Sequence, residues 1–191
     1  MTGAEIEEGK ELAVVEENLS CAYPAGYRLG RQRYLRTQMT VTTFKAIKGR
    51  RPPVRLLSAG RVFRPCPKGE DARHLRVFHQ CDGICVAPGA DLATLKATVE
   101  LVLRAVLGPA DTRWRERDFG FAERGLEADV KLRGRWLEVS GCGTLKADTL
   151  RKADFQLGRV RGFAWGLGLE RLAMVKFGID DIRKLWKPPL V

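Results

Sequence analysis

Side chains that bind transition metals are concentrated in one short stretch of the sequence. Cys66, His74, His79, Cys81 and Cys85 lie within a span of 20 residues. Cysteine thiolates and neutral imidazoles are the ligands that structural zinc favours. Their spacing matches no zinc finger or ribbon, and a free cysteine is commonly a small buried apolar side chain. We therefore favour burial in the core over zinc binding, and keep a zinc site as the alternative.

A glycine-rich segment near the C-terminus has part of a pattern that nucleotide sites use. Gly166 and Gly168 directly precede a segment with helical spacing, residues 169–177. The third glycine of the dinucleotide-binding pattern is absent, and no Gly-Lys-Ser or Gly-Lys-Thr follows anywhere in the chain. Taken alone, this segment is weak evidence for a nucleotide site.

Charge is distributed unevenly along the chain. Residues 18–69 contain twelve Lys and Arg residues and no acid, whereas residues 1–17 contain six acids and one lysine. A cationic stretch of this kind concentrates polyanions, so RNA or a nucleotide polyphosphate is its natural partner. A solvated face that only aids solubility explains the charge pattern about equally well.

Length and composition indicate one globular domain. The chain has 191 residues, of which 45% are hydrophobic and 30% charged, and a net charge of +11. These proportions exclude disordered, collagen-like and membrane-spanning proteins, and no apolar run is long enough to cross a bilayer. Because Glu5, Glu7 and Glu8 stand where an export signal would be basic and then apolar, we expect a cytoplasmic protein with no membrane contact.

Two predicted strands must position the Cys/His stretch. Val54–Arg64 and Val77–Val86 are rich in β-branched and aromatic residues, and the polar loop Pro65–Arg73 separates them. Asp91–Leu107 is predicted to be a helix because its apolar residues recur at spacings of three and four, with Asp91 as N-cap.

The remaining segments complete an α+β pattern. We predict helices at 4–17, 40–48 and 169–177, a loop at 21–30, a hairpin of strands 128–132 and 135–139, a glycine-rich turn at 141–143, and a strand and turn at 162–168. Because the helices are grouped rather than alternating with strands, the pattern favours an antiparallel sheet flanked by helices over a doubly wound parallel sheet.

Two segments resemble the signature motifs of class II aminoacyl-tRNA synthetases. Residues 162–174 (Gly-Phe-Ala-Trp-Gly-Leu-Gly-Leu-Glu-Arg-Leu-Ala-Met) are similar to motif 3, and residues 60–64 with 74–83 (Gly-Arg-Val-Phe-Arg, a loop, then His-Leu-Arg-Val-Phe-His-Gln-Cys-Asp-Gly) are similar to motif 2. Three more segments resemble the catalytic domain of the phenylalanyl-tRNA synthetase α subunit: residues 35–40, 119–130 and 136–143. Five motifs in family order argue strongly against coincidence.

The resemblance implies a site for ATP and Mg²⁺. Arg64 would bridge the α-phosphate and the substrate carboxylate, and His74 and Arg171 would hold the β- and γ-phosphates. Phe78 would stack on adenine, and Glu138 is the candidate ligand for Mg²⁺. Arg64 and Arg171 would be the catalytic residues, since activation of a carboxylate depends on positioning and charge neutralisation and needs no side-chain nucleophile.

The resemblance also implies a site for an aromatic amino acid. Strand alternation puts Phe78, Gln80 and Asp82 on one face and His79 on the other, where a structural role is expected. By analogy with the family, four polar residues would contact the substrate ammonium: Gln38, Thr40, Gln80 and Asp82. An aromatic slot would be formed by Phe119 and Phe121, with Ala122 and Ala164 at its floor.

The sequence departs from the family pattern at several positions. Gly120 and Ala122 replace a proline and a Thr or Val, which would widen the slot, and Cys66 stands where an acid usually follows the motif 2 arginine. Nothing before Leu35 resembles motif 1. We therefore divide the chain into an N-terminal extension of helix and loop, residues 1–34, and a synthetase-like catalytic core, residues 35–191.

The combined interpretation is ATP-dependent activation of phenylalanine or a related aromatic amino acid, followed by transfer to tRNA. The basic segment 18–69 would contact the tRNA phosphates. Two alternatives remain, namely a paralogue that passes the adenylate to a non-tRNA acceptor and a non-catalytic nucleotide-binding partner subunit. The sequence leaves open whether the chain forms a homodimer or joins a partner subunit.

Overall fold

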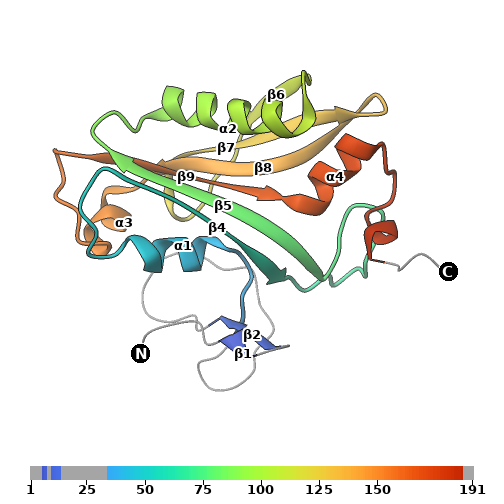
Figure 1. The fold of residues 1–191 in the computed structure, drawn as a ribbon, viewed down its shortest axis with the longest axis horizontal. Helices are drawn as coiled ribbons and strands as arrows, with labels where there is room; N and C mark the ends of the chain where they lie inside the picture. The colour runs from blue at the N-terminus through green and yellow to red at the C-terminus, as the bar shows by residue number, and fades with distance from the viewer. Residues whose placement is uncertain (1–5, 8–9, 14–33, 187–191) are drawn as a thin grey trace.

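The computed structural model of this chain describes residues 6–7, 10–13 and 34–186. Its centre is a six-stranded sheet with the strand order β4-β5-β9-β8-β7-β6 (Figure 1). The strands are β4 (Val54–Phe63), β5 (Val77–Ala87), β6 (Thr112–Glu116), β7 (Ala122–Leu132), β8 (Arg135–Leu145) and β9 (Arg161–Gly168). Every neighbouring pair is antiparallel, which confirms the predicted α+β class.

One face of the sheet is covered by a long helix, α2 (Leu92–Leu107), as Figure 1 shows. Asp91 caps it as predicted, because its carboxylate accepts a hydrogen bond from the backbone N–H of Thr94 at 2.8 Å. Leu95, Val99 and Leu103 are at most 2% exposed and form the main core with the sheet. Each such side chain stabilises the fold by about 1.5–3 kcal/mol.

The opposite face is only partly covered. Figure 1 shows α1 (Thr40–Ile47) and α3 (Ala147–Lys152) there, and both contribute to a second core. The closing helix α4 (Leu169–Phe177) follows β9 directly and leads into a 3-10 helix, η1 (Ile182–Leu185). The part of this face that α1 and α3 leave open carries the candidate site.

The long elements match the sequence-based predictions better than the glycine-rich ones. Strands β4 and β5 and helices α1, α2 and α4 are confirmed, and the predicted hairpin is longer, with eleven residues in each strand. The glycine-rich turn predicted at 141–143 is wrong, because these residues lie inside β8 and pair with β7 and β9. Glycine there serves close packing: a Cβ at Gly141 would lie 2.9 Å from Cζ of Phe119.

The helix predicted at 4–17 is wrong at the residues that the structure describes. Ile6–Glu7 and Lys10–Ala13 form strands β1 and β2, and β2 pairs with β3 (Tyr34–Leu35). The apolar residues of this segment do not form a continuous helical stripe, so strand pairing satisfies the backbone instead. The loop predicted at 21–30 lies outside the described residues. In the described part of the chain, no helix is both long and apolar enough to cross a bilayer.

Candidate active site

A cavity of about 350 Å³ opens on the face of β5 and β9 that α2 does not cover. It brings together all the predicted site residues except Asp82 and Ala122. The predicted residues that line it are Gln38, Thr40, Arg64, His74, Phe78, Gln80, Phe119, Phe121, Glu138, Ala164 and Arg171. Arg64 follows β4 and Arg171 lies in α4, so segments more than 100 residues apart face the same hollow.

A bulge in β8 decides which of its side chains reach this cavity. Asp129 pairs with Glu138 but Ala128 pairs with Ser140, so Val139 is an extra residue in β8. Residues three apart in a regular strand point to opposite faces, which would separate Glu138 from Gly141. The bulge restores both to the cavity face, a common use of bulges beside active sites.

The first end of the cavity is cationic, and hydrogen bonds and an ion pair fix the position of Arg171 there. Arg171 Nη1 donates to the backbone carbonyl of Glu138 at 3.0 Å and lies 3.4 Å from its Oε2. Arg171 Nη2 donates to the carbonyl of Arg73 at 3.3 Å. Arg171 is therefore joined both to β8 and to the loop before β5.

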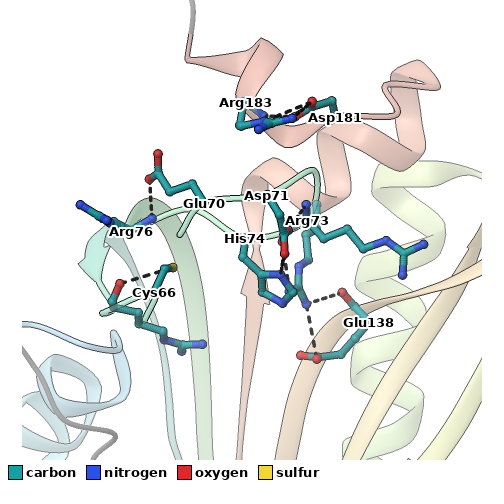
Figure 2. A network of polar contacts seen from close by, with 11 residues as sticks. Cys66, Glu70, Asp71, Arg73, His74, Arg76, Glu138, Asp181 and Arg183 are labelled. Carbon is teal, nitrogen blue, oxygen red and sulfur yellow. Dashed lines mark hydrogen bonds and ion pairs between the residues drawn. The ribbon is translucent and has the colours of Figure 1, made fainter. Parts of the chain in front are cut away.

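His74 is held by a neighbouring acid (Figure 2). Its Nδ1 lies 2.9 and 3.0 Å from the two carboxylate oxygens of Asp71. Hydrogen bonds from the Arg73 backbone and from His74 keep the pKa of Asp71 below its usual value. The loop itself is tied down because the backbone N–H of Ile182 donates to the carbonyl of Ala72 at 3.0 Å. His74 Nε2 has no partner among the described residues and is left for a ligand.

Arg64 lies between the two ends of the cavity. Its Nε donates to the Thr37 carbonyl at 2.9 Å, and its Nη2 to Gln80 Oε1 at 3.4 Å. Its guanidinium carbon is 5.1 Å from the Phe78 ring centroid. Burial lowers the pKa of Arg64, the Glu138 charge opposes that change, and Arg171 adds to it. Arg64, Glu138 and Arg171 thus act on one another electrostatically.

The second end contains a buried carboxylate. Asp82 is 2% exposed, and the Thr40 hydroxyl donates to its Oδ2 at 2.6 Å. Its Oδ1 has no hydrogen-bond partner within the described residues. Burial raises the pKa of Asp82 to about 6, although the Thr40 hydrogen bond, the nearby Gln80 amide and the charges of Arg64 and Arg36 act in the opposite direction. A buried acceptor without a partner favours a cationic ligand close by.

A glycine on β9 lets this carboxylate and the Gln80 amide pack closely against the backbone. A Cβ at Gly166 would lie 2.7 Å from Asp82 Oδ1 and 2.5 Å from Gln80 Nε2. Asp82 does not itself line the cavity, but Gln80, Thr40 and Gly166 around it do. The carboxylate therefore lies directly behind the cavity wall.

Aromatic rings form the wall of the second end. Phe119 and Phe121 are stacked, with centroids 5.8 Å apart and planes at 20°. Phe44 from α1 contacts Phe121 edge-on at 6.2 Å. Ala122, predicted as part of the floor, is instead buried against the backbone of β8, where a Cβ on Gly143 would lie 2.5 Å from its methyl group.

Sequence reasoning missed several cavity residues, among them Arg73, Glu170 and Ile182. Glu170 accepts hydrogen bonds from the backbone N–H of His79 at 2.9 Å and lies 2.8 Å from its Nδ1. The His79 ring also stacks on Trp186 at 5.5 Å, and His79 does not line the cavity, in agreement with a structural role. The basic loop around Arg73 was a usable signal, whereas nothing in the sequence pointed to Ile182.

Within the part of the chain that is described, no three His, Cys, Asp or Glu side chains gather as a metal site. Its four cysteines, Cys66, Cys81, Cys85 and Cys142, are free thiols. Cys85 and Cys142 are buried in the main core, and Cys81 packs against it. Cys66 is separated from that core and lines the cavity.

A family model described as tRNA synthetases class II core domain (F) matches residues 12–190. The chain belongs to this family. The match begins within the segment that we predicted to be an extension, and it includes the last two residues of strand β2 and all of strand β3. Class II synthetases in general use ATP and Mg²⁺, which fits the cationic end of the cavity and the carboxylate of Glu138.

Similar proteins are named phenylalanine–tRNA ligase alpha subunit. That of Prochlorococcus marinus strain NATL2A is 39% identical over 164 residues, which cover 86% of this class II core domain and 48% of the relative. That of Nostoc punctiforme is 37% identical over 156 residues, covering 82% of this chain and 47% of the relative. The chain thus spans about half the length of the curated relatives that it matches.

Proposed function

We propose that this class II core activates phenylalanine with ATP and transfers it to tRNA. The observation that carries the proposal is a single cavity with Arg64 at its centre. Two arginines and a histidine line one end, and two stacked phenylalanines line the other, with the buried acid Asp82 behind the lining residues Thr40 and Gln80. Such a cavity suits a substrate pair made of a polyphosphate and an aromatic ammonium compound.

In the activation step, an oxygen of the amino-acid carboxylate attacks the α-phosphorus of ATP. A new O–P bond forms while the bond to the β-phosphate breaks, and pyrophosphate leaves. Arg64 would contact both reacting groups with its planar fork, because its Nε and Nη2 bonds to Thr37 and Gln80 fix its orientation. Its charge offsets the negative charge that collects on the phosphate oxygens.

His74 and Arg171 would hold the β- and γ-phosphates. Both groups are already fixed, His74 by Asp71 and Arg171 by Glu138, so little side-chain freedom is lost when the phosphates bind. Phe78 has Arg64 close to its ring and would offer a ring face to adenine.

Glu138 fits a Mg²⁺ ligand. Its side chain is 41% exposed at the cavity and lies beside the arginine that would hold the phosphates. Mg²⁺ is commonly bound by one or two carboxylates together with substrate phosphates. When bound, Mg²⁺ would neutralise phosphate charge, and Glu138 would hold it through its carboxylate oxygens.

The amino acid would bind with its ammonium at Asp82 and its ring at Phe119 and Phe121. The free Oδ1 of Asp82 would gain the partner that it lacks. Gln38, Thr40 and Gln80 would supply further polar contacts, and Ala164 on β9 would lie beneath the ring. Ala122, whose methyl group packs against β8, would not contact the ring directly.

We further propose tRNA and a β subunit as partners, and the cytoplasm as the place of action. The relatives are named alpha subunits, which supports a partner subunit. The described part of the basic segment presents exposed cations at Lys48, Arg50, Arg51 and Arg55, at the end of α1 and the start of β4. These would contact tRNA phosphates in a salt-dependent manner.

The test is amino-acid-dependent exchange of labelled pyrophosphate into ATP, measured with the chain alone and with a phenylalanine–tRNA ligase beta subunit. We expect exchange with phenylalanine above tyrosine and tryptophan. No exchange with any aromatic amino acid in either case would contradict the enzyme and favour a nucleotide-binding subunit. Exchange without charging of tRNA would favour transfer of the adenylate to another acceptor.

A further inference from the structure

A second cavity, of about 300 Å³, lies beside the cationic end of the first. The tip of the β7–β8 hairpin, the residues around the end of α4 and the loop before β5 enclose it. Arg73, Arg133, Arg135, Trp136 and Asp180 are among its lining residues. Arg73 also lines the first cavity, so the two are neighbours that share a cationic residue.

The second cavity has an excess of positive charge. The guanidinium groups of Arg73 and Arg135 have no hydrogen bond or ion pair to any residue that the structure describes. Asp180 does not balance them, because its carboxylate already lies 2.6 Å from Lys184 Nζ and 3.5 Å from Arg133 Nη1. The Lys184 contact holds the pKa of Asp180 below its usual value, so it stays ionised and paired. Three arginines around one hollow favour an anion there.

The hairpin tip is built in a way that fixes one of these arginines. Arg133 has a positive φ of 48°, a conformation that non-glycine residues adopt rarely. Its Nη2 donates to the carbonyl of Gly178, just beyond α4, at 2.6 Å. That bond joins the hairpin to the end of the helix and compensates part of the backbone cost, so the wall of the second cavity is held in place.

A connection runs from this cavity to the candidate phosphate site. The carbonyl of Arg73 accepts a hydrogen bond from Arg171 Nη2 at 3.3 Å. Figure 2 shows Arg73 next to His74 on the same loop. Because Arg73 lines both cavities, an anion that leaves His74 and Arg171 would meet Arg73 first and the hairpin arginines next.

We propose that the second cavity binds inorganic pyrophosphate as it leaves the first. This inference rests on the proposed function, which makes pyrophosphate the product at the cationic end. Arginine forks bind phosphate groups through paired hydrogen bonds, and pyrophosphate offers two such groups. Arg113 and Lys131 already contact the Trp136 ring, at 4.7 and 5.2 Å, which disfavours stacking of a nucleotide base on it. The cavity thus suits a phosphate group rather than a nucleotide.

The test is a calorimetric titration of the full chain with magnesium pyrophosphate while a non-hydrolysable ATP analogue saturates the first cavity. We expect one pyrophosphate to bind. Arg135→Ala should raise its dissociation constant by about tenfold or more, as the loss of a hydrogen bond to a charged group predicts. Arg159→Ala is the matched control, since Arg159 is exposed, precedes β9 at the end far from the cavity, and should leave the constant unchanged.

Three outcomes would overturn the proposal. The first is that no pyrophosphate binds in the presence of the analogue. The second is that Arg135→Ala and Arg159→Ala bind pyrophosphate equally well. The third is that Arg135→Ala loses affinity for tRNA but keeps its affinity for pyrophosphate. Arg135→Gln keeps most of the side chain and should behave like the alanine variant. If the ATP analogue itself fails to bind, the proposed function fails. The comparison of Arg135→Ala with Arg159→Ala, repeated with pyrophosphate alone, then still decides the second cavity.

Discussion

The two ends of the main cavity handle charge in opposite ways. At the cationic end, two of the charged side chains have an acidic partner within the protein, His74 with Asp71 and Arg171 with Glu138. The guanidinium of Arg73, which also lines this end, has no such partner among the described residues. At the aromatic end, Asp82 is almost fully buried, and one of its oxygens has no partner among the described residues. The protein partly neutralises the charge at the cationic end, whereas at the aromatic end it leaves the buried carboxylate for the substrate to neutralise.

This difference shows where the fold gives up stability for function. Paired charges at the rim of a cavity cost little, because water and their partners both solvate them. A buried carboxylate with an empty acceptor costs free energy that only a cationic ligand can return. We therefore expect changes at the cationic end to impair the reaction with little effect on stability. Changes at Asp82 should affect both, in opposite directions.

The largest effect is expected at Arg64, which both ends share. Arg64→Ala should lower kcat for pyrophosphate exchange by about 10²–10³, the loss typical when one pre-organised charge contact to a transition state is removed. Arg64→Lys should recover little, since lysine lacks the planar fork. The kcat values are measured by pyrophosphate exchange, with Arg159→Ala as the control variant. Near-normal exchange in Arg64→Ala would show that the reaction centre lies elsewhere.

The next effect separates the two ends. Asp82→Asn should raise KM for phenylalanine by about tenfold or more, because it removes a charge-assisted contact to the ammonium. The same variant should raise the melting temperature of the ligand-free chain, by about 2–4 °C for each kcal/mol gained in stability. Thermal unfolding and exchange kinetics test both halves. A variant that is less stable, or that keeps its KM, would contradict the proposed role of Asp82.

The pH dependence sharpens the same contrast. Burial raises the pKa of Asp82 to about 6, so its proton competes with the substrate ammonium below that pH. We expect kcat/KM for phenylalanine to be constant above about pH 6 and to fall as the pH drops below it.

The stability of the ligand-free protein should change with pH in the opposite sense. A carboxyl whose folded-state pKa is raised binds its proton more tightly when folded, so it favours folding at low pH, and this contribution is lost as the pH rises through about 6. Asp82→Asn should abolish both effects. An acidic limb of kcat/KM that persists in that variant would have to come from another group.

The smallest effect on activity is expected at Ala122. Because its methyl group packs against β8 and not into the cavity, Ala122→Val should overpack the β7–β8 contact and lower the free energy of unfolding by about 1–3 kcal/mol. The preference for phenylalanine over tyrosine should remain. Denaturant unfolding and exchange with both amino acids measure the two quantities, and a changed substrate ranking would place Ala122 in the slot after all.

Local patterns predicted much of this molecule correctly. The spacings of three and four and the Asp91 cap of α2 and the turn at Arg133 and Gly134 are found in the structure. Along β5, Phe78 and Gln80 line the cavity whereas Cys81 and Cys85 pack in the main core, as alternation predicts. The errors are at glycines and at the N-terminus. Sequence alone does not reveal that the Phe119 ring packs over Gly141, so the glycine pattern predicts a turn there. Ile6–Glu7 pairs with the nearby strand Lys10–Ala13, which in turn pairs with the distant strand Tyr34–Leu35.

The sequence by itself determined which chemistry was available: arginines that can bind phosphates, a carboxylate that can bind a cation, and aromatic side chains that can pack against the ring of a substrate. Only the tertiary structure decided which of these side chains share a cavity. The extra residue Val139 turns Glu138 and Gly141 to the same face. The hydrogen bond from the backbone N–H of Ile182 to the carbonyl of Ala72 fixes the loop that bears His74. The first depends on the register of the β7–β8 hairpin, and the second on a hydrogen bond between segments more than 100 residues apart. Neither contact leaves a periodic trace in the residues that make it.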